Sequence, residues 1–296
     1  MKKQPRVIAR GKVFRVPATV QGAFVGKLET MLASMMREAQ KEISDLFYKE
    51  FAREHFGSDG VGMDAANIGS QARILVNKLK GKYDQLFGSV ASDTSKDMVD
   101  GLVRSSTAQG KEQIKTLPGL KERSKEYTIA LEKIDAKTKG LINAAASNAA
   151  DFIKTIPERY LNDVAKAVYN SIVTGNGMQD LIPFFEKHDT GTRNWVRNVA
   201  MDQTRKTYNG LNLGRMRGIG ISRGEWIHSA GSQKPRELHV DFDGKTFDLQ
   251  EGAPVGDDDG NMVQPGEEPY CRCTFAPVLT DGDNGLGVAK EDEDEE

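Results

Sequence analysis

Two histidines and two cysteines in the C-terminal third of the chain are the residue types that could hold a metal ion. His228, His239, Cys271 and Cys273 follow the spacing H-x10-H-x31-C-x-C. Imidazole nitrogens and thiolate sulfurs are the donors that tetrahedral zinc prefers, so one hypothesis is a structural zinc site that staples a small, loop-rich domain. Zinc motifs usually separate paired cysteines by about two to four residues. The single intervening residue therefore favours the alternative: no cofactor, a buried Cys271, a partly exposed Cys273 and histidines that hydrogen-bond to loops.

The cysteine pair also bears on the redox state of the protein. Cys271 and Cys273 are the only cysteines of the chain, and they lie too close together for an ordinary intrachain disulfide. We therefore expect them to be reduced, as in a protein that assembles in the cytoplasm.

Carboxylates in the same part of the chain could instead serve acid–base or metal-dependent nuclease chemistry. The side chains that such an enzyme would use are Asp202, Arg205, Asp241 and Asp243. Carboxylates in a glycine-containing turn such as Asp241–Gly244 more often support the turn itself. The chain also has no phosphate-binding glycine loop, dinucleotide fingerprint or nucleophile elbow. We therefore expect no enzyme. The alternative is a metal-dependent, nucleic-acid-processing enzyme that uses His239, Asp243, Cys271 and Cys273.

Short strands must position these residues. Residues 225–228, 245–248 and 274–279 have the composition of strands, whereas 251–269 is predicted to be an acidic loop and 281–296 a disordered tail. A strand end that reads Cys-Arg-Cys places both sulfurs on one face, because side chains alternate along a strand. Arg272 would then face outward, toward the acidic loop or a phosphate. If His239 reaches the two sulfurs, His228 or Asp243 could complete a tetrahedron.

The first two thirds of the chain are predicted to be helical. Apolar residues recur every three or four positions over 20–56 and again over 68–87, which is typical of amphipathic helices. Thr155-x-x-Glu158 forms a capping box that predicts a helix start at Thr155. The further helices are expected at 93–115, 121–154, 155–173, 179–187 and 192–217.

Asp202, Gln203 and Thr204 interrupt the apolar stripe of the last of these helices. Buried polar groups need hydrogen-bond partners, so we expect this face to pack on the loops that carry His239 and Asp243.

Together these patterns predict a mainly α fold with a small α+β C-terminal domain, in which long amphipathic helices precede a loop-rich compact unit. The predicted divisions are a basic N-terminal arm (1–19), an elongated helical region (20–155), a C-terminal domain (156–280) and an acidic tail (281–296). No run approaches the roughly 18 apolar residues that span a bilayer, so no membrane partner is expected.

Charge is distributed unevenly along the chain. Residues 251–296 carry fourteen acids and two bases, whereas the first fifteen residues carry six bases and no acid. Basic arms contact nucleic acids or acidic protein surfaces, and a pair of solvated tails is the equal alternative. The candidate nucleic-acid contacts are Lys2, Lys3, Arg6, Arg10, Lys12 and Arg15.

The segment from Trp195 to Leu279 resembles the phage Mu protein F-like minor head proteins, a phage head morphogenesis family. Four elements match the family pattern in order: its helix with a following asparagine, its tryptophan strand, its H-x3-D-G-K segment and its C-R-C ending. The residues that carry the resemblance are Asp202, Gln203, Thr204, Asn209, Trp226, His239, Asp243, Gly244, Lys245, Cys271, Arg272 and Cys273. The chain departs from the family at 231–234 and at His228, so a zinc site that uses His228 would be special to this chain.

The resemblance implies a structural virion protein of a tailed bacteriophage that is associated with the portal vertex. Its expected roles are in head assembly and in DNA packaging or delivery. Its expected partners are the portal protein, capsid or scaffold protein, and packaged DNA. Assembly would take place in the host cytoplasm, and the protein would end in the head interior or at the portal vertex. A purely protein-binding adaptor is a further alternative.

Overall fold

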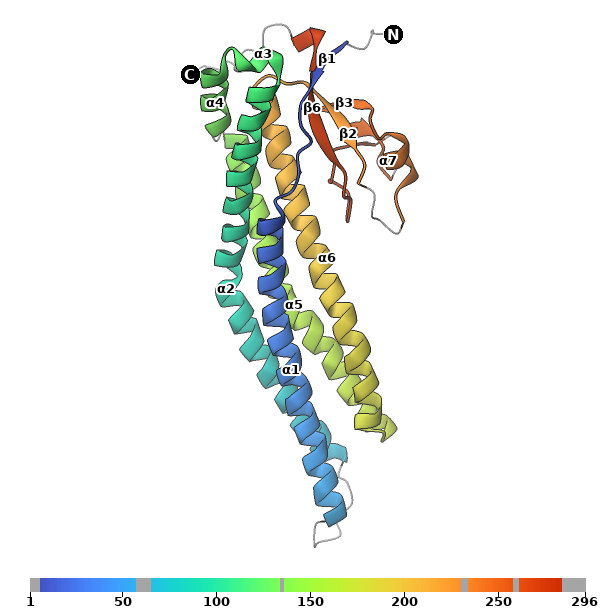
Figure 1. The fold of residues 1–296 in the computed structure, drawn as a ribbon. Helices are drawn as coiled ribbons and strands as arrows, with labels where there is room; N and C mark the ends of the chain where they lie inside the picture. Colours follow the sequence, from blue (N-terminus) through green and yellow to red (C-terminus); the bar gives the residue numbers. More distant parts are fainter. Residues whose placement is uncertain (1–5, 57–64, 134–135, 230–233, 258–260, 284–296) are drawn as a thin grey trace, which may run out of the picture. The chain divides into compact units, whose positions relative to one another are not determined.

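The computed structural model describes residues 6–56, 65–133, 136–229, 234–257 and 261–283 (Figure 1). It is mainly helical, with small antiparallel sheets toward the C-terminus, which confirms the predicted fold class. The helices are α1 (Ala18–Phe56), α2 (Ala65–Thr116), α3 (Pro118–Lys121), α4 (Ser124–Glu132), α5 (Ala136–Thr174), α6 (Met178–Gly218) and α7 (Glu237–Asp241). The strands are β1 (Val7–Arg10), β2 (Arg223–Ile227), β3 (Thr246–Asp248), β4 (Ala253–Pro254), β5 (Met262–Val263) and β6 (Thr274–Thr280).

Contacts group the chain into two compact units. The bundle unit comprises Gly22–Lys96 and Ser147–Ala200, and the sheet unit comprises Met1–Gln21, Asp97–Ala146 and Met201–Glu296. Helices α1, α2, α5 and α6 each contribute residues to both units. The divisions predicted from the sequence run consecutively along the chain, whereas these units join distant segments, because each unit is built from helices that pack side by side.

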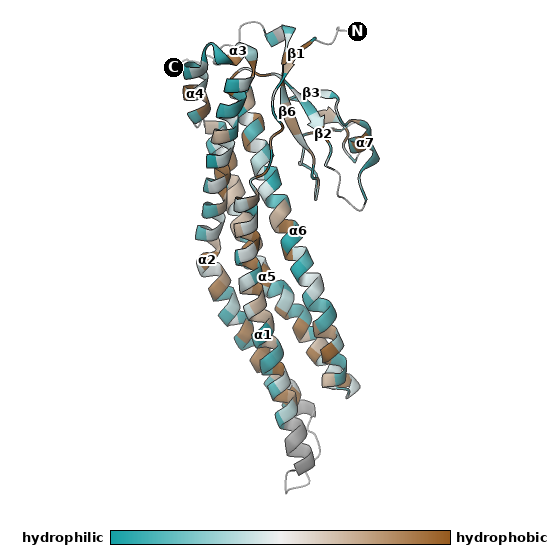
Figure 2. Ribbon diagram, viewed as in Figure 1, coloured by the Kyte–Doolittle hydropathy of each residue, from teal (hydrophilic) through white to brown (hydrophobic). Residues whose placement is uncertain are grey.

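The bundle unit is held together by an apolar core. Most of the predicted stripe of α1 is buried, as is most of that of α2, and hydrophobic positions recur along both helices in Figure 2. The large side chains of these two segments that are fully buried include Leu28, Leu32, Met35, Met36, Tyr83 and Phe87. Burial of such stripes, rather than helix propensity, accounts for most helical stability in proteins.

Side-chain hydrogen bonds show which helices are neighbours in the bundle unit. They join the four segments in a closed ring: Lys82 to Glu38 (α2 to α1, 2.5 Å), Lys80 to Asn162 (α2 to α5, 2.6 Å), Tyr160 to Asp189 (α5 to α6, 2.9 Å) and Gln40 to Asp189 (α1 to α6, 2.8 Å). The bundle unit is therefore a four-helix bundle in the spatial order α1, α2, α5, α6.

Three predicted helix breaks are wrong. The segments 68–87 and 93–115 form one helix, α2, and α5 continues through Thr155 and Pro157. The Thr155 hydroxyl donates to the Phe152 carbonyl within the helix and does not cap a new one. Likewise, 179–187 and 192–217 are one helix, α6.

The reason for this continuity is tertiary burial. Ile153, Ile156 and Tyr160 lie on one buried face on both sides of Pro157, so the core keeps the helix in phase across the proline. In α6, Leu181, Phe185, Thr192, Val196 and Ala200 are likewise buried at helical spacing. A capping pattern is a local preference that this packing overrides.

The four-stranded sheet of the sheet unit has the order β1-β6-β2-β3, and all of its pairs are antiparallel. Three of its strands were predicted, and β6 lies between β1 and β2. Trp226 of β2 is paired with Phe275 of β6, and both are fully buried. This pair lies beside the residues that could do chemistry.

The basic segment at the N-terminus is not a free arm over its described part, which corrects the prediction. Residues 7–10 form β1 along β6, and the Phe14 ring, fully buried, lies 5.0 Å from that of Phe275. Arg10 forms an ion pair with Glu225 and Lys12 one with Glu112, each at 2.7 Å. Lys2 and Lys3 lie outside the described residues.

The region predicted as one acidic loop, 251–269, contains the short antiparallel pair β4–β5. Of the predicted acidic tail, only Asp281–Asp283 is described, as a 3-10 helix that follows β6. Among the described residues, no helix is long and apolar enough to cross a membrane.

A candidate metal centre

Cys271 and Cys273 lie just before β6, and both side chains are buried, each 3% exposed. Arg272 between them is exposed. This alternation is the one that the C-x-C spacing predicted, although the two cysteines precede the strand. Both sulfurs therefore point into the sheet unit together.

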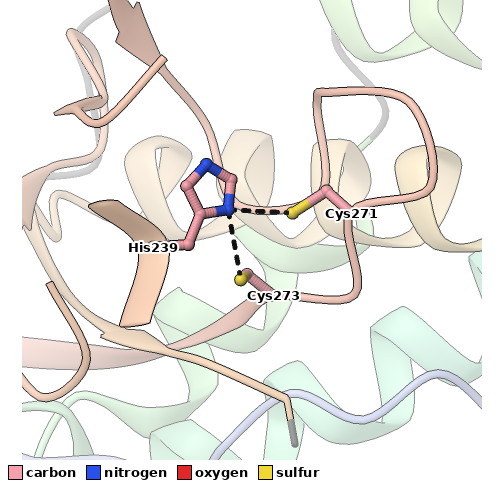
Figure 3. A group of neighbouring side chains, drawn as sticks. All are labelled: His239, Cys271 and Cys273. Carbon is pink, nitrogen blue, oxygen red and sulfur yellow. Dashed lines mark hydrogen bonds between the residues drawn. The ribbon is translucent and has the colours of Figure 1, made fainter. Parts of the chain in front are cut away.

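His239 completes a close trio with the two cysteines (Figure 3). Its Nδ1 atom lies 3.5 Å from Sγ of Cys271 and 3.6 Å from Sγ of Cys273. The histidine sits on α7, a five-residue helix that was not predicted, and its ring packs edge-to-face on Trp226 with 5.1 Å between ring centroids. The buried tryptophan of the sheet thus holds the imidazole against the sulfurs.

His228 is the fourth residue of the predicted set and lies directly after β2. Its Nδ1 atom is 3.7 Å from Sγ of Cys273. Its backbone N–H donates to Oδ1 of Asp243 at 2.7 Å. The structure therefore brings His239, Cys271 and Cys273 into one group and places His228 at its edge, next to Cys273.

Asp243 supports the backbone, as the sequence favoured for a carboxylate in a glycine-containing turn. Its carboxylate accepts the His228 N–H, and Gly244 follows it with a φ of +76°, a left-handed conformation that glycine adopts without strain. The Lys245 ammonium lies 5.8 Å from the centroid of the Phe242 ring. This D-G-K segment forms the turn between α7 and β3, so Asp243 supports the backbone of a candidate ligand.

A carboxylate stands behind the His239 ring. Oε2 of Glu268 lies 2.9 Å from Nε2 of His239, on the side of the ring away from the sulfurs, and its side chain is 11% exposed. Arg236 holds the same carboxylate at 3.2 Å. Carboxylates in this position orient the histidine ligands of metal sites. The sequence showed Glu268 only as one acid of the predicted loop, because the neighbouring residues do not indicate that it lies close to His239.

The trio shifts the proton affinities of its members. The Cys273 thiol donates a hydrogen bond to the Cys271 sulfur, and His239 also stabilises the Cys271 thiolate. Together these contacts outweigh the cost of burying a charge, so the pKa of Cys271 is lowered. That same contact and burial raise the pKa of Cys273. Burial opposes a charged His239, but Cys271 and Glu268 outweigh it and raise the pKa of His239. The group therefore favours a thiolate beside a cation.

Helix α6 fixes the turn that presents the cysteines. Oδ1 of Asp202 accepts the backbone N–H of Tyr270 at 2.7 Å, and Lys206 forms an ion pair with the same carboxylate at 3.0 Å. Tyr270 has a φ of +60°, which is uncommon for a residue with a side chain. The contact from Asp202 holds this strained residue next to Cys271.

Asn209, two turns farther along α6, makes three contacts with the same segment. Its Nδ2 atom donates to the carbonyls of Pro265 and Cys273, each at 2.9 Å, and its Oδ1 atom accepts from the Thr274 hydroxyl at 3.2 Å. A Cβ atom at Gly266 would come within 2.5 Å of Asn209 Nδ2, so only glycine fits there. Asp202 and Asn209 thus form one polar face of α6 that binds the 265–274 segment.

This polar face corrects the predicted packing of Asp202, Gln203 and Thr204. They were expected to pack on the loops of His239 and Asp243. Asp202 instead binds the cysteine segment, and the buried Thr204 hydroxyl accepts from Gln21 Nε2 of α1 at 2.8 Å. Gln203 is only partly buried.

The proposed nuclease residues do not form a metal-binding group among the described residues. The one group of three or more candidate ligands found there is His239, Cys271 and Cys273. Asp202 and Asp243 are both engaged by backbone N–H groups, and Asp241 is exposed at the end of α7. Arg205 is half-buried, and burial lowers its pKa.

Residues 162–276 match the family described as Phage Mu protein F like protein. This segment supports the family predicted from the sequence and contains every motif residue from Asp202 to Cys273. The chain is also similar to a protein of Haemophilus influenzae described only as uncharacterized, with 27% identity over 235 residues. The match covers 79% of this chain and 48% of the relative, so the chain spans about half the relative's length. No solved structure matches.

Proposed function

We propose, on the basis of this family match, that the chain is a minor head protein of a tailed bacteriophage. In this proposal it associates with the portal vertex and acts in head assembly and in DNA packaging or delivery. Its partners are the portal protein, together with capsid or scaffold protein and packaged DNA. It is assembled in the host cytoplasm and resides in the head interior or at the portal vertex.

The observation that carries the proposal is the coincidence of the matched segment with one coherent structural site. Residues 162–276 run from α5 to β6 and include the polar face of α6, the Trp226 strand, the α7 histidine and the cysteine pair. A shared family motif therefore corresponds to side chains that contact one another.

The contacts at this site favour a structural role over an enzymatic one. Asp202 and Asn209 bind backbone groups, Asp243 binds the His228 N–H, and Trp226 is fully buried. These side chains hold segments of the fold in place.

Co-purification with the portal protein tests the proposal. The full chain is co-expressed with the portal protein encoded by the same phage genome, with an unrelated phage's portal protein as the control. We expect retention only with the cognate portal protein. No retention of the cognate portal protein at either low or moderate salt contradicts the portal assignment.

Matched surface variants show which unit carries the contact. Tyr169→Ser with Val173→Ser changes two exposed residues of α5 in the bundle unit, and Leu238→Ser with Val240→Ser changes two exposed residues of α7 in the sheet unit. All four side chains are at least 43% exposed, so both variants are expected to fold. The pair that lowers portal retention identifies the unit in contact.

The DNA contact is tested separately by its salt dependence. Arg6 and Arg15 have exposed side chains in the described part of the basic segment. Replacing both with glutamine is expected to lower the salt-dependence slope of DNA binding by about 2, since each phosphate contact contributes roughly one unit. An unchanged slope excludes these two residues from the DNA contact.

A further inference from the structure

We propose that Cys271, Cys273, His239 and His228 bind one Zn²⁺ ion with a structural role in the sheet unit. This inference is independent of the proposed function. Its basis is the arrangement of four donor atoms from three separate segments: the end of β2, helix α7 and the entry to β6.

The distances between donor atoms are those of a tetrahedral zinc site. With Zn–S of about 2.3 Å and Zn–N of about 2.05 Å, the tetrahedral angle separates sulfur from nitrogen by about 3.6 Å. The three sulfur-to-nitrogen distances here are 3.5, 3.6 and 3.7 Å. The candidate ligand atoms of His239, Cys271 and Cys273 also all lie within 4.8 Å of one another. One ion can therefore contact His239, Cys271 and Cys273 with little movement of the backbone, and His228, which lies next to Cys273, would turn its ring toward the ion.

The donor set selects zinc over hard cations. Two thiolates and two imidazoles are soft or borderline donors, whereas magnesium and calcium require oxygen ligands. Binding releases two protons to solvent: the Cys273 S–H bond is replaced by a Zn–S bond, and the His239 ring gives up its Nδ1 proton, while the Cys271 thiolate bonds to the ion directly. The imidazoles bind through neutral Nδ1 atoms. The resulting centre has no net charge, which suits a position where both cysteines are 3% exposed.

Glu268 completes the arrangement from the second layer. With the metal on Nδ1 of His239, Nε2 carries a proton and faces the Glu268 carboxylate at 2.9 Å. This is the carboxylate–histidine–metal geometry seen around zinc sites. Arg236 positions the carboxylate in turn. Glu268 is thus a positioning residue rather than a ligand.

The ion is structural because the protein fills all four positions of the tetrahedron. A catalytic zinc keeps one position open for water or substrate. Here the ion would join the residue after β2, helix α7 and the segment that leads into β6. The cysteine spacing alone favoured a metal-free pair, and the geometry of the side chains is the reason to propose the ion.

Metal analysis of the full chain tests this proposal. The protein is expressed with added zinc, purified without chelator and analysed for zinc, iron and copper. We expect about one zinc per chain in the wild type and less than about 0.1 in the Cys271→Ser, Cys273→Ser double variant. Arg272→Ser, which changes the exposed residue between the cysteines, is the matched control and retains the ion. Wild type with less than about 0.1 zinc, stoichiometric iron or copper in its place, or full zinc in the double variant overturns the proposal.

Cobalt substitution of the wild type identifies the ligands without relying on variants that fail to fold. Co²⁺ in a tetrahedral site with two thiolates gives strong visible absorption and a sulfur-to-cobalt charge-transfer band. We expect both in the wild type, a changed visible spectrum in His228→Ala, and about 10- to 100-fold weaker metal binding in Glu268→Gln. An octahedral cobalt spectrum in the wild type contradicts the site. An unchanged spectrum in His228→Ala removes His228 from the ligand set.

Discussion

In the bundle unit, the buried side chains repeat one pattern along α1, α2, α5 and α6, whereas the sheet unit depends on a few side chains that each make several specific contacts. Leu28 and Leu32 are buried in the same way as their neighbours in the apolar stripe of α1. Asn209 and His239 have no equivalent among the described residues of the sheet unit. Stability is therefore distributed over many residues in one unit and concentrated in few residues in the other.

The two tryptophans of the chain make this comparison measurable, because one lies in each unit. Trp195 packs edge-to-face on Phe152, and the Arg159 guanidinium lies 4.1 Å from its ring centroid. Trp226 is fully buried in the sheet unit. Trp195→Phe and Trp226→Phe each leave one fluorescent reporter, so the unfolding of each unit can be followed separately.

The largest expected effect is that of removing the proposed zinc ion from the sheet unit. A strong chelator should lower the free energy of unfolding reported by Trp226 by several kcal/mol, because binding of a structural zinc contributes directly to folding. The denaturant midpoint of this reporter should fall accordingly. The midpoint reported by Trp195 should move far less. Equal shifts of both reporters would contradict the concentrated stability of the sheet unit, and re-addition of zinc should restore the first midpoint.

Next in size is a core truncation in the bundle unit. Leu32→Ala removes a side chain that is 0% exposed and should lower the free energy of unfolding by about 2–5 kcal/mol. Denaturant unfolding followed by Trp195 measures it. Ile74→Ala, which truncates an exposed residue of α2, is the control and should cost less than about 0.5 kcal/mol. A loss for Leu32→Ala as small as that of the control would place the α1 stripe outside the core.

Asn209→Ala tests the polar face of α6. The substitution leaves two buried carbonyls without their donor, so we expect a loss of about 1–3 kcal/mol in the unfolding followed by Trp226. Asn162→Ala, the same change in the bundle unit, removes one partly buried contact to Lys80 and should cost less than about 1 kcal/mol. Similar losses for the two variants would remove the distinction between the units.

A smaller effect separates two adjacent residues of α6. Thr204→Val removes the hydroxyl that accepts from Gln21 and should cost about 1 kcal/mol, because that hydroxyl is buried. Gln203→Leu changes a partly buried side chain and should stay within about 0.5 kcal/mol. Thermal or denaturant unfolding of both variants measures the two losses of stability. Equal losses for Thr204→Val and Gln203→Leu would contradict the difference in burial between these residues.

The smallest expected effect is a change of pH dependence in the bundle unit. Burial lowers the pKa of His188, against the opposing effects of Asp163 and Asp189, so the folded state favours the neutral ring. Its contribution is present above the ordinary histidine pKa and is lost as the pH falls. His188→Phe keeps the stacking on Phe184 and should flatten the loss of stability on acidification. An unchanged pH profile by Trp195 fluorescence would exclude His188 as its source.

The sequence was sufficient to predict features that repeat locally. The buried positions from Phe24 to Phe47 follow from their own spacing, because one helix face must be apolar to pack. It was not sufficient for β1, whose residues Val7–Arg10 pair with a strand about 270 positions away. It also failed at Thr155, where the buried face of α5 outweighs a local capping pattern.

The candidate site was predicted in its residue types and in the shared face of the two cysteines, whereas the contacts that bring its segments together were not predicted. The donor chemistry of His228, His239, Cys271 and Cys273 is visible in the sequence. Their proximity depends on α7 and on the contacts of Asp202 and Asn209 with the 265–274 segment, which are tertiary. Glu268 could not be identified from the sequence, because nothing distinguishes it from the other acids of residues 251–269 or shows that it lies next to His239.

The measurement that tests the proposed function most directly is the protein composition of purified phage heads. Heads separated from tails are analysed by quantitative mass spectrometry for this chain and for the portal protein. The account predicts this chain in the head fraction, in a fixed small ratio to the portal protein, and its depletion from particles when the portal protein is absent. Absence of the chain from purified proheads and mature heads alike would contradict it.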